Sequence, residues 1–309
     1  MAIDDGFESE LNFSIDLARR AGAIIKEASA KRWQNANVQI DSSKKNRVDL
    51  VTETDQRVEK VVKEAIAQTF PQHKFIGEES FAAGEKAELT DEPTFIVDPI
   101  DGTTNFAHGF PWCCISIGLA YKKQPVLGVI YNPFLELLYS ARKGHGAWLN
   151  ESTRLPLSHP NPLPLASLGD AVICVEWGSD RSKAVMEAKG ESFTRLAGDP
   201  TQVKGGIMAH SLRSLGSAAL NYCAVAAGQM DLYHEIGCWA WDVTGGAAIA
   251  REAGAKVYAR NGKELQGDDL MGHHFLVVRA IAPTDSETSE QVQDRIVKEF
   301  MGAVTEYDV

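Results

Sequence analysis

The sequence lacks long apolar runs, an excess of positive charge and closely paired cysteines. No hydrophobic run approaches the ~18 residues that a membrane-spanning helix needs, so no membrane association is expected. Lysine and arginine number 31 against 42 aspartates and glutamates, a net charge of −11. This balance speaks against a nucleic-acid partner, which requires basic clusters to neutralise phosphates. An anionic substrate would instead need metal ions or helix N-termini to attract it.

Targeting signals and disulfide patterns are also missing. The opening segment MAIDDGFESE is acidic, whereas a signal peptide begins with a basic region and a transit peptide avoids acidic residues. The five cysteines form an odd set without C-x-x-C spacing, which predicts buried thiols in a reducing compartment. A cytoplasmic location is therefore expected.

The length and composition indicate a globular protein of two lobes. At roughly 150 residues per domain, 309 residues predict about two units. The stretch 153–170 holds four prolines and little periodicity, so we expect an N-terminal lobe over 1–155 and a C-terminal lobe over 156–309. Several predicted strands are joined by connections too short for a parallel crossover, which predicts mixed or antiparallel sheets layered with helices.

Hydrophobic periodicity predicts where these elements lie. Thr54 is a candidate N-cap for the second helix, and Thr288 with Gln291 is a candidate capping box for the last one. Helices are predicted at 8–32, 55–69, 181–200, 211–228, 242–254 and 286–302. Strands are predicted at 75–76, 94–97, 113–121, 126–131, 137–142, 171–177, 230–234, 256–259 and 275–280.

The most informative segment is 95–106, FIVDPIDGTTNF. A predicted strand ends at Asp98, Asp101 follows three residues later, and Gly102 permits a tight turn. Two crowded carboxylates repel each other unless a cation lies between them, and a helix starting after Gly102 would offer free N–H groups to a phosphate. The simpler alternative is a turn with one capping and one surface aspartate.

Other carboxylates could complete such a site. Glu78 and Glu79 follow a predicted strand end, Asp242 begins a helix rich in small residues, and Asp55 begins the second predicted helix. Each alone is weak evidence, and Asp55 alone would be an ordinary partner of a helix dipole. Together the candidates offer only oxygen ligands, without a histidine or cysteine pattern, which favours Mg²⁺ over Zn²⁺.

These motifs together resemble the inositol monophosphatases, within the lithium-sensitive, Mg²⁺-dependent phosphatase superfamily. The resemblance extends from the segment DLVTETD at 49–55 to about residue 280, and GEES, DPIDGTTNF and WDVTGGA occur in the family's order. It implies a layered αβαβα sandwich of the sugar-phosphatase type. It also implies two or three Mg²⁺ ions, lithium inhibition, a homodimer, and hydrolysis of inositol 1- (or 4-) phosphate to inositol and phosphate by a metal-activated water.

The resemblance also implies residue roles. Glu78 and Thr103 would orient and deprotonate the attacking water, and Asp55 would lie near the more weakly held metal. The implied metal ligands are Glu78, Asp98, the carbonyl of Ile100, Asp101 and Asp242. The implied phosphate contacts are Gly102, Thr103 and Thr104. The implied substrate contacts are Asp101, Ser217, Ala218, Glu235 and Lys44.

The chain departs from the family pattern at two positions expected to flank the substrate. Trp239 stands where a histidine is frequent, and Thr244 stands where alanine or cysteine is usual. Both leave room for altered specificity.

Three alternatives stay open. The loop resembles the D-x-D-G-T motif of phosphatases that form an aspartyl-phosphate, but its two aspartates are three residues apart instead of two. The substrate could be fructose bisphosphate, another sugar phosphate or a 3′-phosphoadenosine nucleotide. A metal-free binding homologue would keep the fold but would be expected to lose carboxylates.

Overall fold

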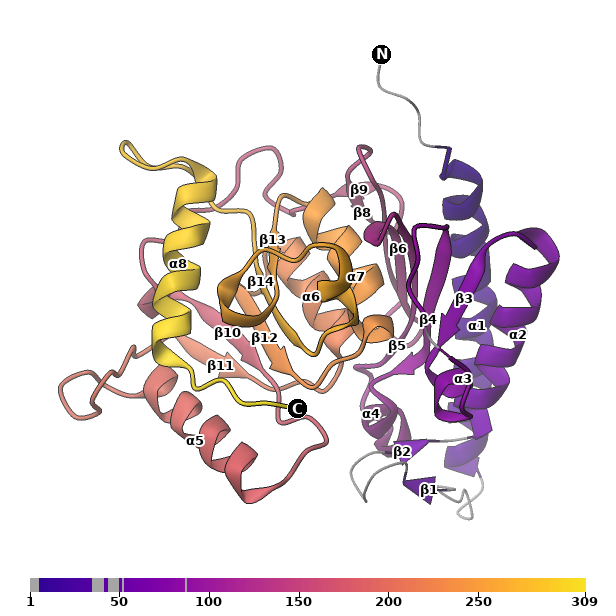
Figure 1. Cartoon of the computed structure of the whole chain (residues 1–309), viewed down its shortest axis with the longest axis horizontal. Helices are drawn as coiled ribbons and strands as arrows, with labels where there is room; N and C mark the ends of the chain where they lie inside the picture. Colours follow the sequence, from indigo (N-terminus) through magenta and orange to yellow (C-terminus); the bar gives the residue numbers. More distant parts are fainter. Residues whose placement is uncertain (1–5, 35–41, 44–49, 52, 87) are drawn as a thin grey trace.

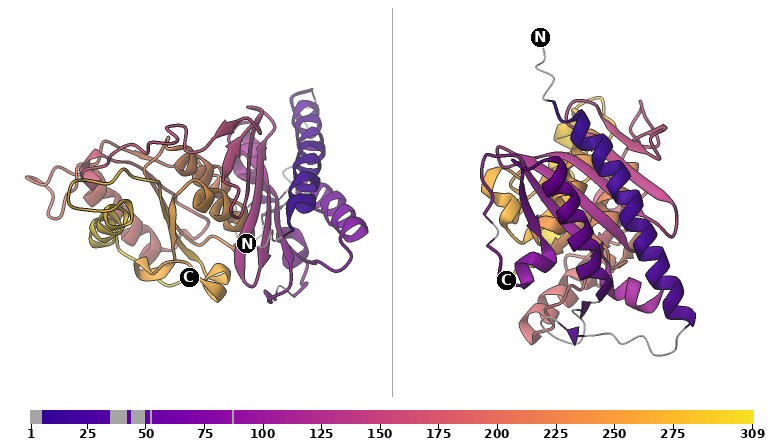
Figure 2. Two further views of the ribbon diagram at one scale, coloured as in Figure 1. Left: turned by 90° about the horizontal axis from the view of Figure 1, so that it is seen from above. Right: turned by 90° about the vertical axis from the view of Figure 1, so that its right-hand side faces the viewer.

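The computed structural model describes residues 6–34, 42–43, 50–51, 53–86 and 88–309, and it stacks helices and sheets in five layers (Figures 1 and 2). Two long helices, α1 (Glu8–Gln34) and α2 (Glu53–Thr69), cover the outer face of a seven-stranded sheet. A central layer of α6 (Ala218–Ala227) and α7 (Ala240–Glu252) separates this sheet from a five-stranded one. The predicted αβαβα arrangement is confirmed.

The seven-stranded sheet has the order β3-β4-β5-β6-β7-β8-β9. Only its first pair, β3 and β4, is parallel. Short hairpins connect each strand to the next from β5 through β9. Lys122 and Lys123 both adopt positive φ at the β5–β6 turn, the geometry that matches the twist of paired strands. The strands are β3 (Lys74–Gly77), β4 (Thr94–Asp101), β5 (Cys114–Tyr121), β6 (Gln124–Asn132), β7 (Leu137–Arg142), β8 (Ala147–Leu149) and β9 (Thr153–Arg154).

The five-stranded sheet has the order β11-β10-β12-β14-β13 and is mixed, as predicted. Strands β11, β10 and β12 run parallel, whereas β14 is antiparallel to both of its neighbours. Helices α5 (Lys183–Ala197) and α8 (Ser289–Ala303) cover its outer face, where Figure 1 shows them. The strands are β10 (Val172–Val175), β11 (Ser211–Arg213), β12 (Leu232–Ile236), β13 (Lys256–Tyr258) and β14 (His274–Val278).

Small residues let the central layer approach the larger sheet closely. A Cβ at Gly128 of β6 would lie 2.1 Å from the carbonyl oxygen of Gly245 in α7. A Cβ at Gly118 of β5 would lie 2.6 Å from the side chain of Thr244. The small-residue pattern of the predicted helix 242–254 therefore has a packing cause, because larger side chains would push α7 away from the sheet.

The remaining elements are short. A two-stranded sheet pairs β1 (Ser42–Ser43) with β2 (Leu50–Val51), and two short helices, α3 (Glu78–Ala82) and α4 (Thr103–His108), follow β3 and β4. Single 3₁₀ turns are η1 (Leu168–Asp170), η2 (Arg260–Gly262) and η3 (Gly267–Met271).

Several boundaries differ from the sequence prediction. The segment predicted as a helix over 211–228 begins with strand β11, and the helix starts only after the cap Ser217. Thr54 lies inside the first turn of α2 and is not its N-cap. Helix α3 and strands β8 and β9 were not predicted. The Thr288–Gln291 capping box is confirmed, and the division at residue 155 stays a prediction.

All five cysteines are buried and unpaired, as expected. Within the described ranges, each helix is too short or too polar to cross a membrane.

Candidate active site

Three carboxylates converge at the junction of the larger sheet and the central helical layer. Asp98 and Asp101 come from the end of β4, and Asp242 comes from the first turn of α7. One oxygen of each lies within 4.8 Å of the others, and Asp98 and Asp101 are only 3% and 6% exposed. Asp242 is half-buried, so residues 144 positions apart in sequence share one site that is only partly open to solvent.

A bulge in β4 brings the first two carboxylates together. In a regular strand, side chains three residues apart point to opposite faces of the sheet. Here Asp98 pairs with Ser116 and Asp101 with Cys114, so three steps along β4 match two steps along β5. The extra residue in β4 shifts the alternation and allows both carboxylates to join the cluster. The Ile100 N–H donates to Asp98 Oδ1 at 2.9 Å inside this bulge.

Burial and mutual repulsion disfavour the charged forms of these carboxylates. Burial raises the pKa of Asp98 well above its usual value, and the charges of Glu78, Asp101 and Asp242 raise it further. Burial, Asp101 and Glu78 likewise raise the pKa of Asp242. Because a divalent cation would remove this repulsion, the donor set fits a hard ion such as Mg²⁺.

Asp101 is partly stabilised by the start of α6. Burial raises its pKa to about 6, although hydrogen bonds from Ser217 and Ala219 act in the opposite direction. The Ser217 hydroxyl and the Ala219 N–H, the latter at 2.8 Å, both donate to Asp101 Oδ2. The Ala218 N–H also helps to hold this carboxylate in its charged form. The predicted substrate residues Ser217 and Ala218 thus contact a predicted metal ligand.

Glu78 is positioned by a carboxylate that the sequence analysis missed. Glu59 of α2 accepts the backbone N–H groups of Glu79 at 2.6 Å and Ser80 at 2.7 Å, which fixes the first turn of α3. A Cβ at Gly77 would lie 2.6 Å from Glu59 Oε2, so this approach requires glycine. The sequence did carry a signal for Glu59. This charged residue lies among the apolar positions of the predicted helix, one turn before Val62, on the face of α2 that is buried.

The turn after β4 places Thr103 between two acceptors. Gly102 adopts φ 86° as the N-cap of α4, and a Cβ there would lie 2.9 Å from the Trp112 carbonyl oxygen. Thr103 Oγ1 lies 3.2 Å from Asp55 Oδ1 and 3.0 Å from the Ile100 carbonyl oxygen. Its single proton can donate to only one of them at a time. Thr103 and Thr104 form the first turn of α4.

Two further polar residues missed from sequence tie this turn to α6. Asn105 donates from Nδ2 to the carbonyls of Trp112 and Leu215, both at 2.7 Å. The buried Glu176 accepts the N–H groups of Leu215 at 2.7 Å and Gly216 at 2.8 Å. Their partners come from distant segments, so no local pattern revealed them.

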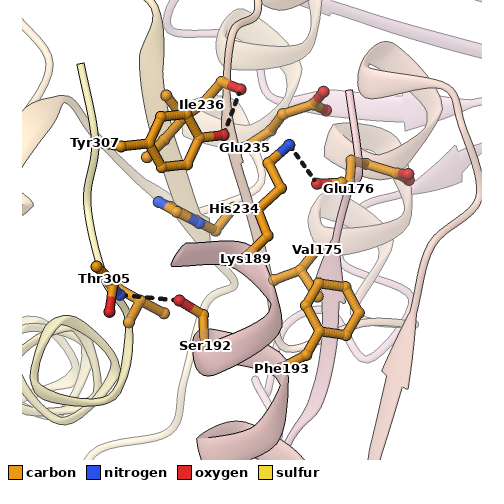
Figure 3. A pocket seen from close by; sticks show the side chains of 11 residues that line it. Val175, Glu176, Lys189, Ser192, Phe193, His234, Glu235, Ile236, Thr305 and Tyr307 are labelled. Atoms are coloured by element: carbon orange, nitrogen blue, oxygen red, sulfur yellow. Dashed lines mark hydrogen bonds between the residues drawn. The ribbon is translucent and has the colours of Figure 1, made fainter. Parts of the chain in front are cut away.

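Glu235 lies outside the three-carboxylate cluster, in a neighbouring pocket of about 30 Å³ that Lys189 and Tyr307 also line (Figure 3). Burial and the charge of Glu176 raise its pKa to about 7, against hydrogen bonding from Tyr233 and the charge of Lys189. The charge of Glu235 in turn contributes to the raised pKa of Asp242, so the two sites are coupled. Lys44 lies outside the described residues.

The two departures from the family pattern have different surroundings. The backbone N–H of Trp239 donates to Asp242 Oδ2 at 2.6 Å, and the residue is 39% exposed. Thr244 is fully buried, its hydroxyl donates to the Ala240 carbonyl at 2.6 Å, and its side chain faces Gly118. Packing against β5 therefore occupies the Thr244 side chain, and its influence on the substrate stays a prediction.

Comparison with known proteins agrees with this geometry. The model of the inositol monophosphatase family matches residues 8–301. The chain belongs to the inositol monophosphatase family. Its relatives include inositol monophosphatase 3 of Solanum lycopersicum, 39% identical over 94% of this chain and 97% of that protein. Another is quinic acid degradation cluster protein x of Neurospora crassa, 38% identical over 96% and 94%.

The fold of the family agrees as well. An inositol monophosphatase from Anabaena sp. PCC 7120 superimposes with a TM-score of 0.72 at 28% identity, covering 96% of this chain and 97% of the other. The chain is therefore a phosphatase of a Mg²⁺-dependent family that acts on small phosphate substrates.

Proposed function

We propose that this protein hydrolyses inositol 1- (or 4-) phosphate to inositol and phosphate. The observation that carries the proposal is the convergence of the buried Asp98 and Asp101 with the half-buried Asp242 within 4.8 Å. Glu78 and the Ile100 carbonyl complete the proposed ligand set for two or three Mg²⁺ ions. When bound, Mg²⁺ supplies Lewis acidity toward water and phosphoryl oxygens.

Thr103 and Glu78 orient the attacking water and accept its proton in this proposal. The position of Thr103 Oγ1, between Asp55 Oδ1 at 3.2 Å and the Ile100 carbonyl at 3.0 Å, supports the role. Donation toward Asp55 leaves a lone pair of the Thr103 hydroxyl available to the water proton. Asp55 is 1% exposed, so its carboxylate is shielded from bulk water.

The phosphate is held by Gly102, Thr103 and Thr104 at the start of α4. The left-handed Gly102 supports this role, since its φ of 86° turns the chain directly after the second carboxylate. Backbone N–H groups bind an anion without a cationic side chain, which suits a protein of net charge −11. Asp101, Ser217, Ala218, Glu235 and Lys44 are proposed to contact the alcohol.

The test is phosphate release from inositol 1-phosphate with Mg²⁺ and then with EDTA. Asp98→Asn is compared with Asp268→Asn, which removes an exposed carboxylate paired with Lys123. Mg²⁺-dependent turnover that is lost only in Asp98→Asn supports the proposal. Metal binding without turnover of this ester would instead assign a different substrate, and absence of both would favour a binding homologue.

One relative favours a second ring compound as substrate. The 38% identical Neurospora protein is named for quinic acid degradation, so a phosphorylated ring acid is the second candidate. A substrate panel with a phosphorylated ring acid, fructose bisphosphate and a 3′-phosphoadenosine nucleotide distinguishes these candidates from inositol phosphate by kcat/KM.

The homodimer and the lithium inhibition that the resemblance implies are also proposed for this protein. Light scattering tests the first, and titration of the activity with LiCl tests the second.

A further inference from the structure

An aromatic cluster lies beside the carboxylates and is partly open to solvent. Phe81 and Trp239 are 36% and 39% exposed, and both contact the buried Trp241. The Phe81 ring centroid lies 5.1 Å from that of Trp239 and 5.3 Å from that of Trp241. We call Phe81, Trp239 and Trp241 the aromatic wall.

The wall is attached to the metal-ligand segments at two points. Phe81 follows Glu78 by three residues on α3, so the two side chains lie on the same face of that helix. Trp239 precedes Asp242 by three residues, and its backbone N–H donates to the Asp242 carboxylate at 2.6 Å. A molecule bound by its phosphate at the carboxylate cluster therefore has the wall as a neighbour.

The wall is preorganised. Trp239 and Trp241 stack with an interplanar angle of 4° and a centroid separation of 5.1 Å. His273 packs at 77° to Trp239, and its Nδ1 lies 2.9 Å from the Cys238 carbonyl, which makes that nitrogen a donor. A ring that binds here gains apolar contact without ordering the side chains first.

We propose that the aromatic wall receives the leaving alcohol, and that it extends the substrate range to phosphate monoesters carried by a ring with a flat apolar face, such as aryl phosphates. This inference rests on the proposed phosphatase function and adds a substrate class to it. Contact between the exposed aromatic carbons of the wall and an apolar ring removes both surfaces from water, which favours binding. A fully hydroxylated ring instead requires hydrogen-bonding partners for its hydroxyls. Aryl and hydroxylated esters would share the phosphate site and differ in their contact with the wall.

The test compares phenylphosphonate with methylphosphonate, two C–P analogues that are not hydrolysed as esters. Binding to the Mg²⁺-loaded protein is followed by calorimetry and by tryptophan fluorescence. We expect phenylphosphonate to bind about tenfold more tightly, corresponding to partial burial of one aromatic ring. In Trp239→His and Phe81→Val the affinity ratio falls toward one. Leu135→Ala, which removes an apolar side chain 43% exposed on the β6–β7 loop, keeps the wild-type ratio.

Two results would overturn the inference alone. A ratio near one in the wild type, with inositol 1-phosphate still hydrolysed, would show that the wall does not contact the leaving group. A Trp239→His protein whose mass by light scattering falls to that of a smaller oligomer would place the wall at a subunit interface. Failure of both phosphonates to bind, together with no turnover of any ester, would overturn the proposed function as well.

Discussion

At the scale of single residues, the site is built from carboxylates that would be unfavourable neighbours elsewhere. Asp98, Asp101 and Asp242 have raised pKa values because burial and mutual repulsion disfavour their charged forms. The carboxylates that the proposed function needs therefore lower the stability of the fold. Single substitutions can separate the effect on activity from the effect on stability.

Asp98→Asn is expected to be inactive but more heat-stable than the wild type in EDTA. Asparagine cannot be charged, so it avoids the cost of burying the Asp98 carboxylate beside Glu78, Asp101 and Asp242. Tm should therefore rise by a few degrees, whereas turnover falls at least about 10³-fold. Calorimetry in EDTA and an Mg²⁺-dependent phosphate assay check the two halves. A clear fall in Tm would show that Asp98 has a structural role that outweighs the repulsion.

Glu235 is expected to give KM a pH dependence near neutrality. Its pKa of about 7 makes the carboxyl largely neutral at pH 6 and charged at pH 8. The charged form is the better acceptor for hydroxyl groups, so KM for inositol 1-phosphate should rise as the pH falls from 8 to 6. In Glu235→Gln the part of this pH dependence that comes from Glu235 should disappear, while the titration of the substrate phosphate and of Asp101 remains. Identical profiles for the two proteins would remove Glu235 from the binding site.

At the scale of elements, the site depends on departures from regular secondary structure. The extra residue in β4 puts two carboxylates into one cluster. The first turn of α3 is held from outside, by Glu59 of α2. These irregularities position Asp98, Asp101 and Glu78, and they are fixed by neighbouring elements.

Glu59→Gln is expected to weaken Mg²⁺ binding without abolishing the fold. The amide can present an oxygen to only one of the N–H groups of Glu79 and Ser80, and its NH₂ faces the other, which loosens the turn that carries Glu78. We expect a loss of about 10- to 100-fold in Mg²⁺ affinity, measured by calorimetry. Glu64→Gln, on the exposed face of the same helix, is the matched control. Equal affinities in both variants would contradict this role.

The contact between α7 and the larger sheet is expected to tolerate no added atoms. Gly128→Ala places a Cβ 2.1 Å from the Gly245 carbonyl oxygen and should destabilise the protein by about 1–3 kcal/mol or more. Gly190→Ala is the control, since a Cβ there meets nothing within 4 Å and alanine favours the helix α5. Urea unfolding should show opposite shifts of the midpoint. Similar shifts would mean that the backbone of α7 yields easily.

At the scale of the whole molecule, the active site joins two layers of the sandwich. Asp98 and Asp101 belong to the seven-stranded sheet, whereas Asp242 and the Ser217 cap belong to the central helical layer. A cation bound by all three carboxylates therefore stabilises the packing of these layers as well as the site.

Stabilisation by Mg²⁺ is expected to grow with pH. An acid whose folded pKa exceeds its unfolded value stabilises the fold at low pH, and this contribution is lost as the pH rises through the folded pKa. For Asp101 the window runs from about 4 to about 6. The Mg²⁺-induced rise in Tm should thus be larger at pH 7.5 than at pH 5, and smaller in Asp98→Asn. A shift independent of pH, measured at constant ionic strength, would contradict the coupling.

The sequence by itself determined the local structure and the chemical character of the site. Apolar residues at spacings of three and four determined α1 and α2, because burial of one helix face depends on local periodicity. The carboxylate segments predicted an all-oxygen site, and their order indicated the family before any contact was known.

Only the tertiary structure decided which groups touch. The β4 bulge, the hydrogen bonds of Glu59 to α3 and the aromatic wall each depend on partners far away in sequence. Nothing in a local window specifies such distances. The predicted helix at 211 failed for the same reason, since pairing with β10 makes 211–213 a strand. The packing of Thr244 against Gly118 could not be predicted either, because Gly118 lies on another element. Local propensity sets what a segment can form, and packing between layers selects what it does form.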